Sequence, residues 1–300
     1  MYSLRSPKSC AIFLSNALNL PWLTAGAGFS WCRFPPYAVG TSMTTTLTTD
    51  LNADAGESFG HWPLGDDARL FPLLTSVNLA LGFHAGDPVT LHSAVRLARQ
   101  HGLGIGAHPG YPDLVGFGRR ELALTPLEIQ AATLYQIGAL QAFLTVEGGT
   151  LQHVKAHGAL YMRIHEDRAA GEAFCHAVQQ LVPQAYLIVL AGAAGSDLAL
   201  TAAAHGLRVR REAFPERAYT GDGRLASRQL PGSSIHDPAE AARRAVGMAQ
   251  GWVQTLGGER LALEMDTLCI HGDNPQAVAI AGAIRAALAE NGVTLARLHD

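Results

Sequence analysis

Short apolar segments of strand length alternate with amphipathic helical segments through most of the 300-residue chain. This alternation is typical of a parallel sheet whose connecting helices cover its faces. The sequence therefore predicts an α/β fold, either a closed barrel or a doubly wound sheet. A barrel is favoured because no glycine-rich dinucleotide-binding fingerprint follows the first strand. Seven strands are predicted at Leu47 to Asn52, Val77 to Leu81, Leu103 to Ala107, Leu151 to Lys155, Tyr186 to Leu190, Leu207 to Arg211 and Thr267 to Ile270, and Val293 to Leu298 offers an eighth.

Capping side chains immediately before proline mark four helix starts. The pairs are Asp87-Pro88, Thr125-Pro126, Asp237-Pro238 and Asn274-Pro275. Asp, Thr and Asn accept hydrogen bonds from the first free amides of a helix, and proline suits the first helical position because its missing N–H has no partner there. We therefore expect a helix to begin at each pair.

The longest stretch without a periodic pattern runs from about Ala213 to His236. A loop of this length in a compact domain is usually functional or mobile. It follows Glu212 and contains Arg217 and Arg228, which suit closure over a polar ligand. A solvated surface excursion is the alternative, and the sequence does not decide between the two.

Composition and charge exclude several classes of protein. The hydrophobic fraction of 48% and the 32 glycines indicate a large core with many turns, and residues 43–300 suit one barrel domain. The 22 basic and 25 acidic residues are scattered, which argues against a nucleic-acid partner. No apolar run approaches the roughly 18 residues of a membrane span. The four cysteines form no CxxC pair and fit a reducing compartment, so we expect a cytoplasmic protein.

Residues 1–42 differ in character from the rest of the chain. The segment Ala25-Gly26-Ala27 resembles the cleavage site of a secretory signal, but Pro21 and several polar residues interrupt the apolar stretch before it. We expect an extension that is not part of the fold, with Met43 as a candidate functional start.

Polar residues gather after the carboxyl ends of five predicted strands. In parallel α/β folds these ends meet on one face, where catalytic groups lie. With 13 histidines some coincidence is expected, but four of them occupy equivalent positions in different strand–helix units. We interpret them as parts of one site, in which Asp54 and Glu57 act as bases or metal ligands and the imidazoles as proton shuttles or metal ligands. These histidines are His84, His108, His157 and His271.

Lys155 stands out because the chain otherwise uses arginine for positive charge. Of the 22 basic residues only Lys8 and Lys155 are lysine. A compact ammonium binds phosphate or carboxylate as a point charge, which a planar guanidinium does not reproduce. We therefore interpret Lys155 as an electrostatic clamp, with a structural salt bridge as the alternative. Cys269 is interpreted as a small buried hydrophobe and Asp87 mainly as a helix cap, whereas Asp273 either points into the site or orients His271.

Hydrolysis of an amide or ester is the reaction class that this set of groups suits. The sequence contains neither the GxSxG motif of a serine hydrolase nor the GxxxxGK[ST] motif of a P-loop ATPase.

Six motifs resemble those of the LamB/YcsF family. They are DLNADAGESFG, NLALGFHAGD, GAHPGYPD with FGRR, HVKAHGALY, REAFPERAY and CIHGD, and they run in family order from about Thr49 to the C-terminus. Leu81, Ala156 and Met162 replace the Cys, Pro and Asn that are common in the family, and they remove no candidate catalytic group. The resemblance implies an irregular (β/α) barrel related to metal-dependent polysaccharide deacetylases.

The resemblance also implies ring opening of 5-oxo-L-proline to L-glutamate, coupled to hydrolysis of ATP with Mg and performed together with partner subunits B and C. A five-membered lactam is an unreactive amide, and phosphorylation of its oxygen would give a better electrophile. A phosphate from ATP needs a cation, for which Lys155 is the candidate. The implied catalytic positions are Asp54, His84, His108, Lys155, His157, His271 and Asp273, and the implied substrate-binding positions are Asn52, Glu57, Arg119, Tyr161, Glu212 and Arg217.

Two alternatives remain open at this point. The first is a metal-dependent hydrolase similar to the deacetylases, with Asp54, His84 and His108 as ligands. The second is a non-catalytic subunit that binds substrate while its partners perform the chemistry. The sequence leaves open whether the barrel binds a divalent metal.

Overall fold

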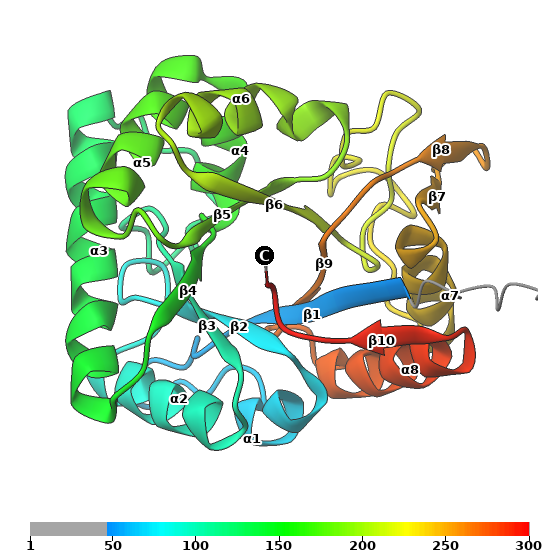
Figure 1. Cartoon of the computed structure of the whole chain (residues 1–300), viewed down its shortest axis with the longest axis horizontal. Coiled ribbons are helices and arrows are strands. Elements are labelled where there is room, and N and C mark those ends of the chain that lie inside the picture. The colour runs from blue at the N-terminus through cyan, green and yellow to red at the C-terminus, as the bar shows by residue number, and fades with distance from the viewer. Residues whose placement is uncertain (1–46, 300) are drawn as a thin grey trace, which may run out of the picture. The chain divides into compact units, whose positions relative to one another are not determined.

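The computed structural model describes residues 47–299, so the extension predicted over residues 1–42 and the start at Met43 lie outside the described residues. Within this range seven parallel strands close into a barrel, because the last of them pairs back to the first (Figure 1). The closed ring confirms the predicted barrel. Its strands, in spatial order, are β1 (Leu47–Ala55), β2 (Ser76–Ala80), β3 (Gly104–His108), β4 (Leu151–Val154), β5 (Tyr186–Leu190), β6 (Arg208–Ala213) and β9 (Thr267–His271).

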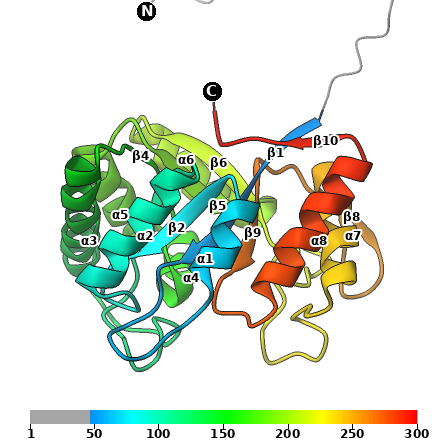
Figure 2. The ribbon, with the colours of Figure 1, turned by 90° about the horizontal axis from the view of Figure 1, so that it is seen from below.

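The predicted eighth strand forms but lies outside the ring. β10 (Val293–Leu295) pairs in parallel with the first three residues of β1, whereas β9 pairs with β1 from Asp50 onward. The residues after β10 then cross the amino ends of the strands (Figure 2): the Ala296 N–H donates to the Thr49 carbonyl, and the Gln152 amide donates to the Leu298 carbonyl. The end of the described chain therefore covers the amino-terminal end of the barrel.

The sequence pattern missed one hairpin, formed by β7 (Trp252–Gln254) and β8 (Arg260–Ala262). Each strand has three residues, and between them only Val253 is fully buried. Such short strands carry no alternation that a pattern could detect.

The helices surround the barrel (Figure 1), and within residues 47–299 none of them combines the length and apolar character that a membrane span requires. Three predicted starts are confirmed, because the side chains of Asp87, Thr125 and Asp237 accept hydrogen bonds from the first turns of α2, α3 and α7. The helices are α1 (Asp67–Leu70), α2 (Pro88–Gln100), α3 (Pro126–Glu147), α4 (Gly158–Glu166), α5 (Arg168–Leu181), α6 (Ser196–Ala204), α7 (Pro238–Ala249) and α8 (Ala277–Glu290).

The fourth predicted helix start is wrong. α8 begins at Ala277, and the Asn274-Pro275 pair lies in the turn before it. The Asn274 side chain is engaged in that turn: its oxygen accepts from the Gln276 N–H, and its nitrogen donates to Glu216 Oε1. The Asn274 oxygen therefore makes a local, cap-like bond within the turn before α8, while its amide nitrogen contacts a distant loop.

The barrel interior is polar, and this positions the side chains at the carboxyl ends of the strands. Alternate residues of a strand point to opposite faces, so Asp50, Asn52 and Asp54 share the inner face of β1. The Asn52 amide donates to Thr267 of β9 at 2.6 Å, and the Asn78 amide of β2 donates to both Asn52 (2.7 Å) and Asp54 (2.9 Å). A continuous hydrogen-bonded column thus runs up the barrel and ends at Asp54.

The predicted irregular stretch between β6 and α7 is present and is anchored to the protein. The Tyr219 hydroxyl accepts from the Phe214 N–H, and Arg217 Nη2 donates to the Ala226 carbonyl, with Tyr219 and Arg217 buried. The part of the stretch next to β6 is therefore buried against the protein, whereas most of residues 221–232 are exposed to solvent.

Candidate active site

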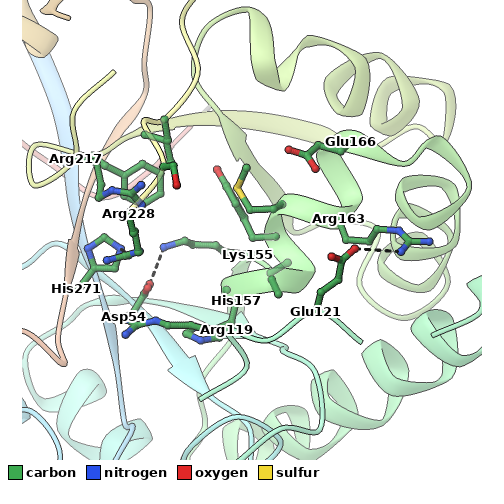
Figure 3. A pocket seen from close by; sticks show the side chains of 18 of the residues that line it. Asp54, Arg119, Glu121, Lys155, His157, Arg163, Glu166, Arg217, Arg228 and His271 are labelled. Atoms are coloured by element: carbon green, nitrogen blue, oxygen red, sulfur yellow. Dashed lines mark hydrogen bonds and ion pairs between the residues drawn. The ribbon is translucent and has the colours of Figure 1, made fainter. Parts of the chain in front are cut away.

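A cavity of about 430 Å³ opens at the carboxyl ends of the barrel strands (Figure 3). Lys155 and Asp54 point toward each other at its base, and His271 and Arg228 lie beside them. Eight of the thirteen predicted site residues line this cavity, namely Asp54, His108, Arg119, Lys155, His157, Tyr161, Arg217 and His271.

The other five predicted residues lie behind the cavity wall or at its edge. Glu57 and His84 are buried beside His108 and His157. Glu212 contacts Lys155, and Asp273 contacts Arg119. Asn52 lies lower in the barrel, where its amide belongs to the hydrogen-bonded column below Asp54.

Lys155 follows β4 and joins two buried carboxylates. Its Nζ lies 2.7 Å from Asp54 Oδ1 and 3.2 Å from Glu212 Oε2. Burial alone would lower the pKa of Lys155, but the attraction of Asp54 and the other neighbouring acidic groups outweighs it and raises that pKa well above its usual value. The ammonium therefore stays charged inside the barrel.

Cys269 is fully buried, as the sequence predicted, but it also contacts this ion pair. Lys155 Nζ lies 2.9 Å from Cys269 Sγ. Burial raises the pKa of the Cys269 thiol well above its usual value, so the sulfur stays protonated. A role as nucleophile is disfavoured, which agrees with the interpretation from sequence.

Three histidines from different strand ends form one buried group. His157 Nδ1 lies 3.0 Å from His108 Nε2, and the rings of His84 and His157 stack with centroids 3.7 Å apart. Burial, and then the neighbouring imidazoles, lower the pKa values of His84 and His157 well below the usual range. Together with Glu57 these side chains offer four ligand atoms within 4.8 Å of one another, so the group could hold a metal ion.

The connection from β3 to α3 is shaped to fit these rings. Gly118 has φ of 62°, and a Cβ there would lie 2.7 Å from His84 Cβ and 2.9 Å from His157 Cδ2. Phe117 before it is the one non-glycine residue between 47 and 299 with a positive φ, at 54°. Its carbonyl accepts from His157 Nε2 at 2.8 Å. Backbone strain of this kind is found where a site fixes its side chains.

His271 is held by Glu216, a residue that was not among the sequence-based candidates. Glu216 Oε2 accepts from the His271 backbone N–H at 2.7 Å and lies 3.1 Å from His271 Nδ1. Asp273 instead pairs with Arg119 at 2.7 Å, so the carboxylate that orients His271 is that of Glu216. Glu216 lies within the REAFPERAY motif, and that membership was the available signal.

The rim of the cavity is rich in arginine. Arg119 lies over the Phe117 ring, 4.8 Å from its centroid, and Arg228 Nη2 is 3.4 Å from His271 Nε2. Arg217 is 9% exposed and also faces the cavity. Burial, and then the nearby Arg228, lower the pKa of Arg217 to about 10, which still leaves it charged near neutral pH. Such a rim attracts small anions.

The fold and the site together define a parallel (β/α) barrel protein with a histidine-rich cavity at the carboxyl ends of its strands. The chain belongs to the LamB/YcsF family, whose model matches residues 49–300. It is 55% identical over 248 residues to a protein of Thermus thermophilus named as the A subunit of 5-oxoprolinase, an alignment that covers 82% of this chain and 98% of that one. A protein of Syntrophobacter fumaroxidans with the same name is 46% identical over 248 residues, 82% of this chain and 97% of that one.

Solved structures support the same relationship. The crystal structure of the lactam utilization protein from Thermus thermophilus matches with a TM-score of 0.79 and 52% identity, over 84% of this chain and all of that one. A putative cellobiose-phosphate cleavage protein from Enterococcus faecalis matches with a TM-score of 0.51 at 12% identity, over 84% of this chain and 98% of that one, which shows a shared fold alone.

Proposed function

We propose that this chain is the A subunit of an ATP-dependent 5-oxoprolinase, which opens the lactam ring of 5-oxo-L-proline to give L-glutamate and works in a complex with subunits B and C. The names of two relatives and membership of the LamB/YcsF family support this proposal. The observation that carries it is the cavity itself, where a buried lysine, a carboxylate and histidines lie at the base and arginines at the rim.

The substrate matches this distribution of charge. 5-Oxoproline carries one carboxylate and one polar lactam amide on a small ring. The rim arginines Arg119, Arg217 and Arg228 suit the carboxylate, because guanidinium groups bind carboxylates through paired N–H donors. The base of the cavity then receives the lactam, next to Lys155, Asp54 and His108.

The reaction breaks the lactam C–N bond, adds the oxygen of water to the carbonyl carbon and leaves a proton on the amine nitrogen. Transfer of the terminal phosphoryl group of ATP to the lactam oxygen, with release of ADP, would activate the carbonyl carbon, and inorganic phosphate would leave once water has attacked. ATP with Mg is thus a co-substrate of the complex. Asp54, which lines the cavity, is placed to accept the proton of the water, since general bases act over hydrogen-bond distances.

The position of Lys155 changes which cation we assign to the phosphate. Two carboxylates already lie within 3.2 Å of Lys155 Nζ, which offsets its charge. We therefore assign the anionic groups mainly to the rim arginines. Lys155 is instead assigned to hold Asp54 ionised and in place at the base.

The first test measures glutamate release by the full chain combined with subunits B and C. Glutamate should form from 5-oxoproline only when ATP and Mg are present. A Lys155→Ala, His157→Ala double variant should lose activity by at least about 100-fold, the usual cost of removing electrostatic and acid–base groups. Unchanged activity in an Asp54→Asn variant would instead indicate a subunit that binds substrate while its partners perform the chemistry.

The second test examines the rim. Arg228→Gln should raise KM for 5-oxoproline more than it lowers kcat, because it removes a contact to the carboxylate that is present before and during the reaction. Arg224→Gln is the matched control, since Arg224 lies in the same loop, is exposed and pairs with Asp222. An equal effect of the two substitutions would contradict the assignment of Arg228.

A further inference from the structure

Four buried side chains from different strand ends point their ligand atoms at one another. The four are Glu57 after β1, His84 after β2, His108 at the end of β3 and His157 after β4. Each is at most 5% exposed, and their ligand atoms all lie within 4.8 Å of one another. A histidine and glutamate cluster buried to this degree needs either a full set of hydrogen bonds or a shared cation.

The hydrogen bonds of two of these histidines fix where their protons lie. His108 Nδ1 is 2.8 Å from the Lys155 carbonyl oxygen, and His157 Nε2 is 2.8 Å from the Phe117 carbonyl oxygen. A carbonyl oxygen only accepts, so in each neutral ring that nitrogen carries the proton. The opposite nitrogens, His108 Nε2 and His157 Nδ1, then face each other across 3.0 Å with two lone pairs and no hydrogen between them.

The other two members of the cluster have buried atoms without a partner. Both ring nitrogens of His84 and the Oε1 atom of Glu57 lack a hydrogen-bond partner among the described residues. His84 Nε2 and Glu57 Oε1 are 3.8 Å apart, which is too long for a hydrogen bond. The four side chains therefore present two opposed lone pairs and further unsatisfied acceptor sites to one small volume.

We propose that Glu57, His84, His108 and His157 form a binding site for one divalent transition-metal cation of the zinc class. Three imidazole nitrogens and one carboxylate oxygen favour Zn²⁺ or a similar ion over Mg²⁺ and Ca²⁺, which prefer oxygen ligands. A cation at this point satisfies together the two lone pairs of His108 and His157, Glu57 Oε1 and one ring nitrogen of His84. This inference goes beyond the proposed lactam hydrolysis and does not depend on it.

The surroundings of the cluster match those of metal sites. Histidine ligands usually donate their second N–H to a backbone carbonyl or carboxylate, as His108 and His157 do here. The parallel rings of His84 and His157 would have to tilt out of their stack, a rotation about side-chain bonds alone. A cation bound there would supply Lewis-acid polarisation of a substrate oxygen at the edge of the cavity.

Asp54 is assigned to a neighbouring role rather than to this site. Its Oδ1 already contacts Lys155 Nζ at 2.7 Å and accepts from the Asn78 amide at 2.9 Å. Asp54 Oδ2 lies 3.3 Å from His108 Nε2. A proton on His108 Nε2, shared with Asp54, is thus the competing occupant, but it leaves Glu57 Oε1 and both nitrogens of His84 without partners.

Metal content is the direct test. The full chain is stripped with a chelator, dialysed separately against Zn²⁺, Co²⁺, Mn²⁺ or Mg²⁺, and analysed by mass spectrometry for metal per chain and by calorimetry for affinity. We expect about one Zn²⁺ per chain, no retained Mg²⁺, and for Co²⁺ the visible absorption of a nitrogen-ligated, low-coordinate ion. Failure of all four ions to bind in stoichiometric amount would overturn the proposal and favour the proton on His108.

Matched variants locate the ion. Loss of a residue that only supports a metal ligand weakens metal binding by about 10–100-fold. Glu57→Gln and His84→Asn each remove a ligand and should weaken Zn²⁺ binding by more than this. Glu216→Gln and His271→Asn make the same chemical changes at the nearby cavity wall and should retain one ion per chain. Equal losses in both pairs would refute the ligand set. Thermal melts check folding, and Glu57→Asp replaces Glu57→Gln if the latter fails to unfold cooperatively.

Metal content and 5-oxoprolinase activity, measured on the same protein, distinguish failure of this proposal from failure of the proposed function. Zinc binding without 5-oxoprolinase activity would support the metal site and refute the function, whereas ATP-dependent activity in protein that retains no metal would refute the site and leave the function standing.

Discussion

The Lys155 ammonium lies 2.7 Å from the Asp54 carboxylate inside the barrel, where the two side chains are 3% and 8% exposed. Glu212 adds a second carboxylate within 3.2 Å of the same ammonium. Burial of two acidic groups beside one base costs desolvation energy, which only close pairing offsets. The three side chains therefore depend on one another for stability as well as for any chemistry.

Removal of this ammonium should destabilise the fold. Lys155→Met leaves Asp54 and Glu212 buried without a counter-ion, and we expect a loss of about 3–5 kcal/mol in the free energy of unfolding. Adding Glu212→Gln to that variant should recover part of the loss, because one uncompensated acid is removed. Urea unfolding measures both. A loss below about 1 kcal/mol for the single variant would contradict this account.

Glu216 should matter for activity although it lies outside the strand ends. Both oxygens of the Glu216 carboxylate accept hydrogen bonds, from His271 and from Asn274, whereas the amide in Glu216→Gln has only one acceptor oxygen and must lose one of these contacts. We expect kcat for glutamate release by the complex to fall about 10–100-fold, as for other residues that orient a functional imidazole. The control is Glu264→Gln, an exposed carboxylate paired with Arg211, which should leave kcat unchanged.

Two glycines with similar backbone angles should respond differently to alanine. Gly60 has φ of 55° with open space around it, so Gly60→Ala should cost only the left-handed conformation, about 1–2 kcal/mol. Gly118 has φ of 62°, and the new methyl would also collide with His84 and His157, which adds about 1–3 kcal/mol. Denaturant unfolding of both variants tests the difference. Equal losses would mean that the contact with the two rings is not tight.

His165 should make stability depend on pH. Its Nδ1 donates to the Tyr161 carbonyl at 2.7 Å and its Nε2 accepts from the Leu190 N–H at 3.0 Å, so the folded state requires the neutral ring. Burial lowers the pKa of His165 to about 4, below its unfolded value of about 6.5. Its contribution is therefore complete above pH 6.5 and is lost as the pH falls toward 4.

The variant His165→Gln tests that assignment. Between pH 7 and pH 5 the wild-type chain should lose about 1–2 kcal/mol more of its unfolding free energy than this variant does, because only the wild type must keep an imidazole at position 165 unprotonated. Urea titrations at the two pH values supply the comparison. Identical losses in the two proteins would show that His165 does not contribute to the pH dependence.

The sequence predicted the barrel because its signals are local. The strand from Tyr186 to Leu190 is a continuous buried run, and Asp87-Pro88 marks a helix start by its own chemistry. The site was predicted where a residue ends a strand, as His108 does, or directly follows one, as Lys155 does. Such positions are set by the topology of parallel sheets rather than by distant contacts.

Local sequence patterns could not predict contacts between segments that are distant along the chain. Glu216 lies in an irregular loop, and nothing in its neighbours shows that it contacts His271. Asn78 lies in a strand whose other residues are mostly apolar, yet its amide donates a hydrogen bond to Asp54 inside the barrel. Asn274 has the side chain of a helix cap, but it caps a turn before α8 and also donates to Glu216. In each case the partner is far away along the chain.

The pairing of β1 with the last strands of the chain governs when this protein can fold during its synthesis. Leu47 pairs with Val293, and Asp50 with Thr267. Among the described strands β1 therefore leaves the ribosome first, but it meets two of its partners only after nearly all the other strands have emerged. Contacts of such long sequence separation form slowly. Until then an unpaired edge of β1 is open to other chains, and a nascent chain stalled before β9 is the state in which a chaperone has most to protect.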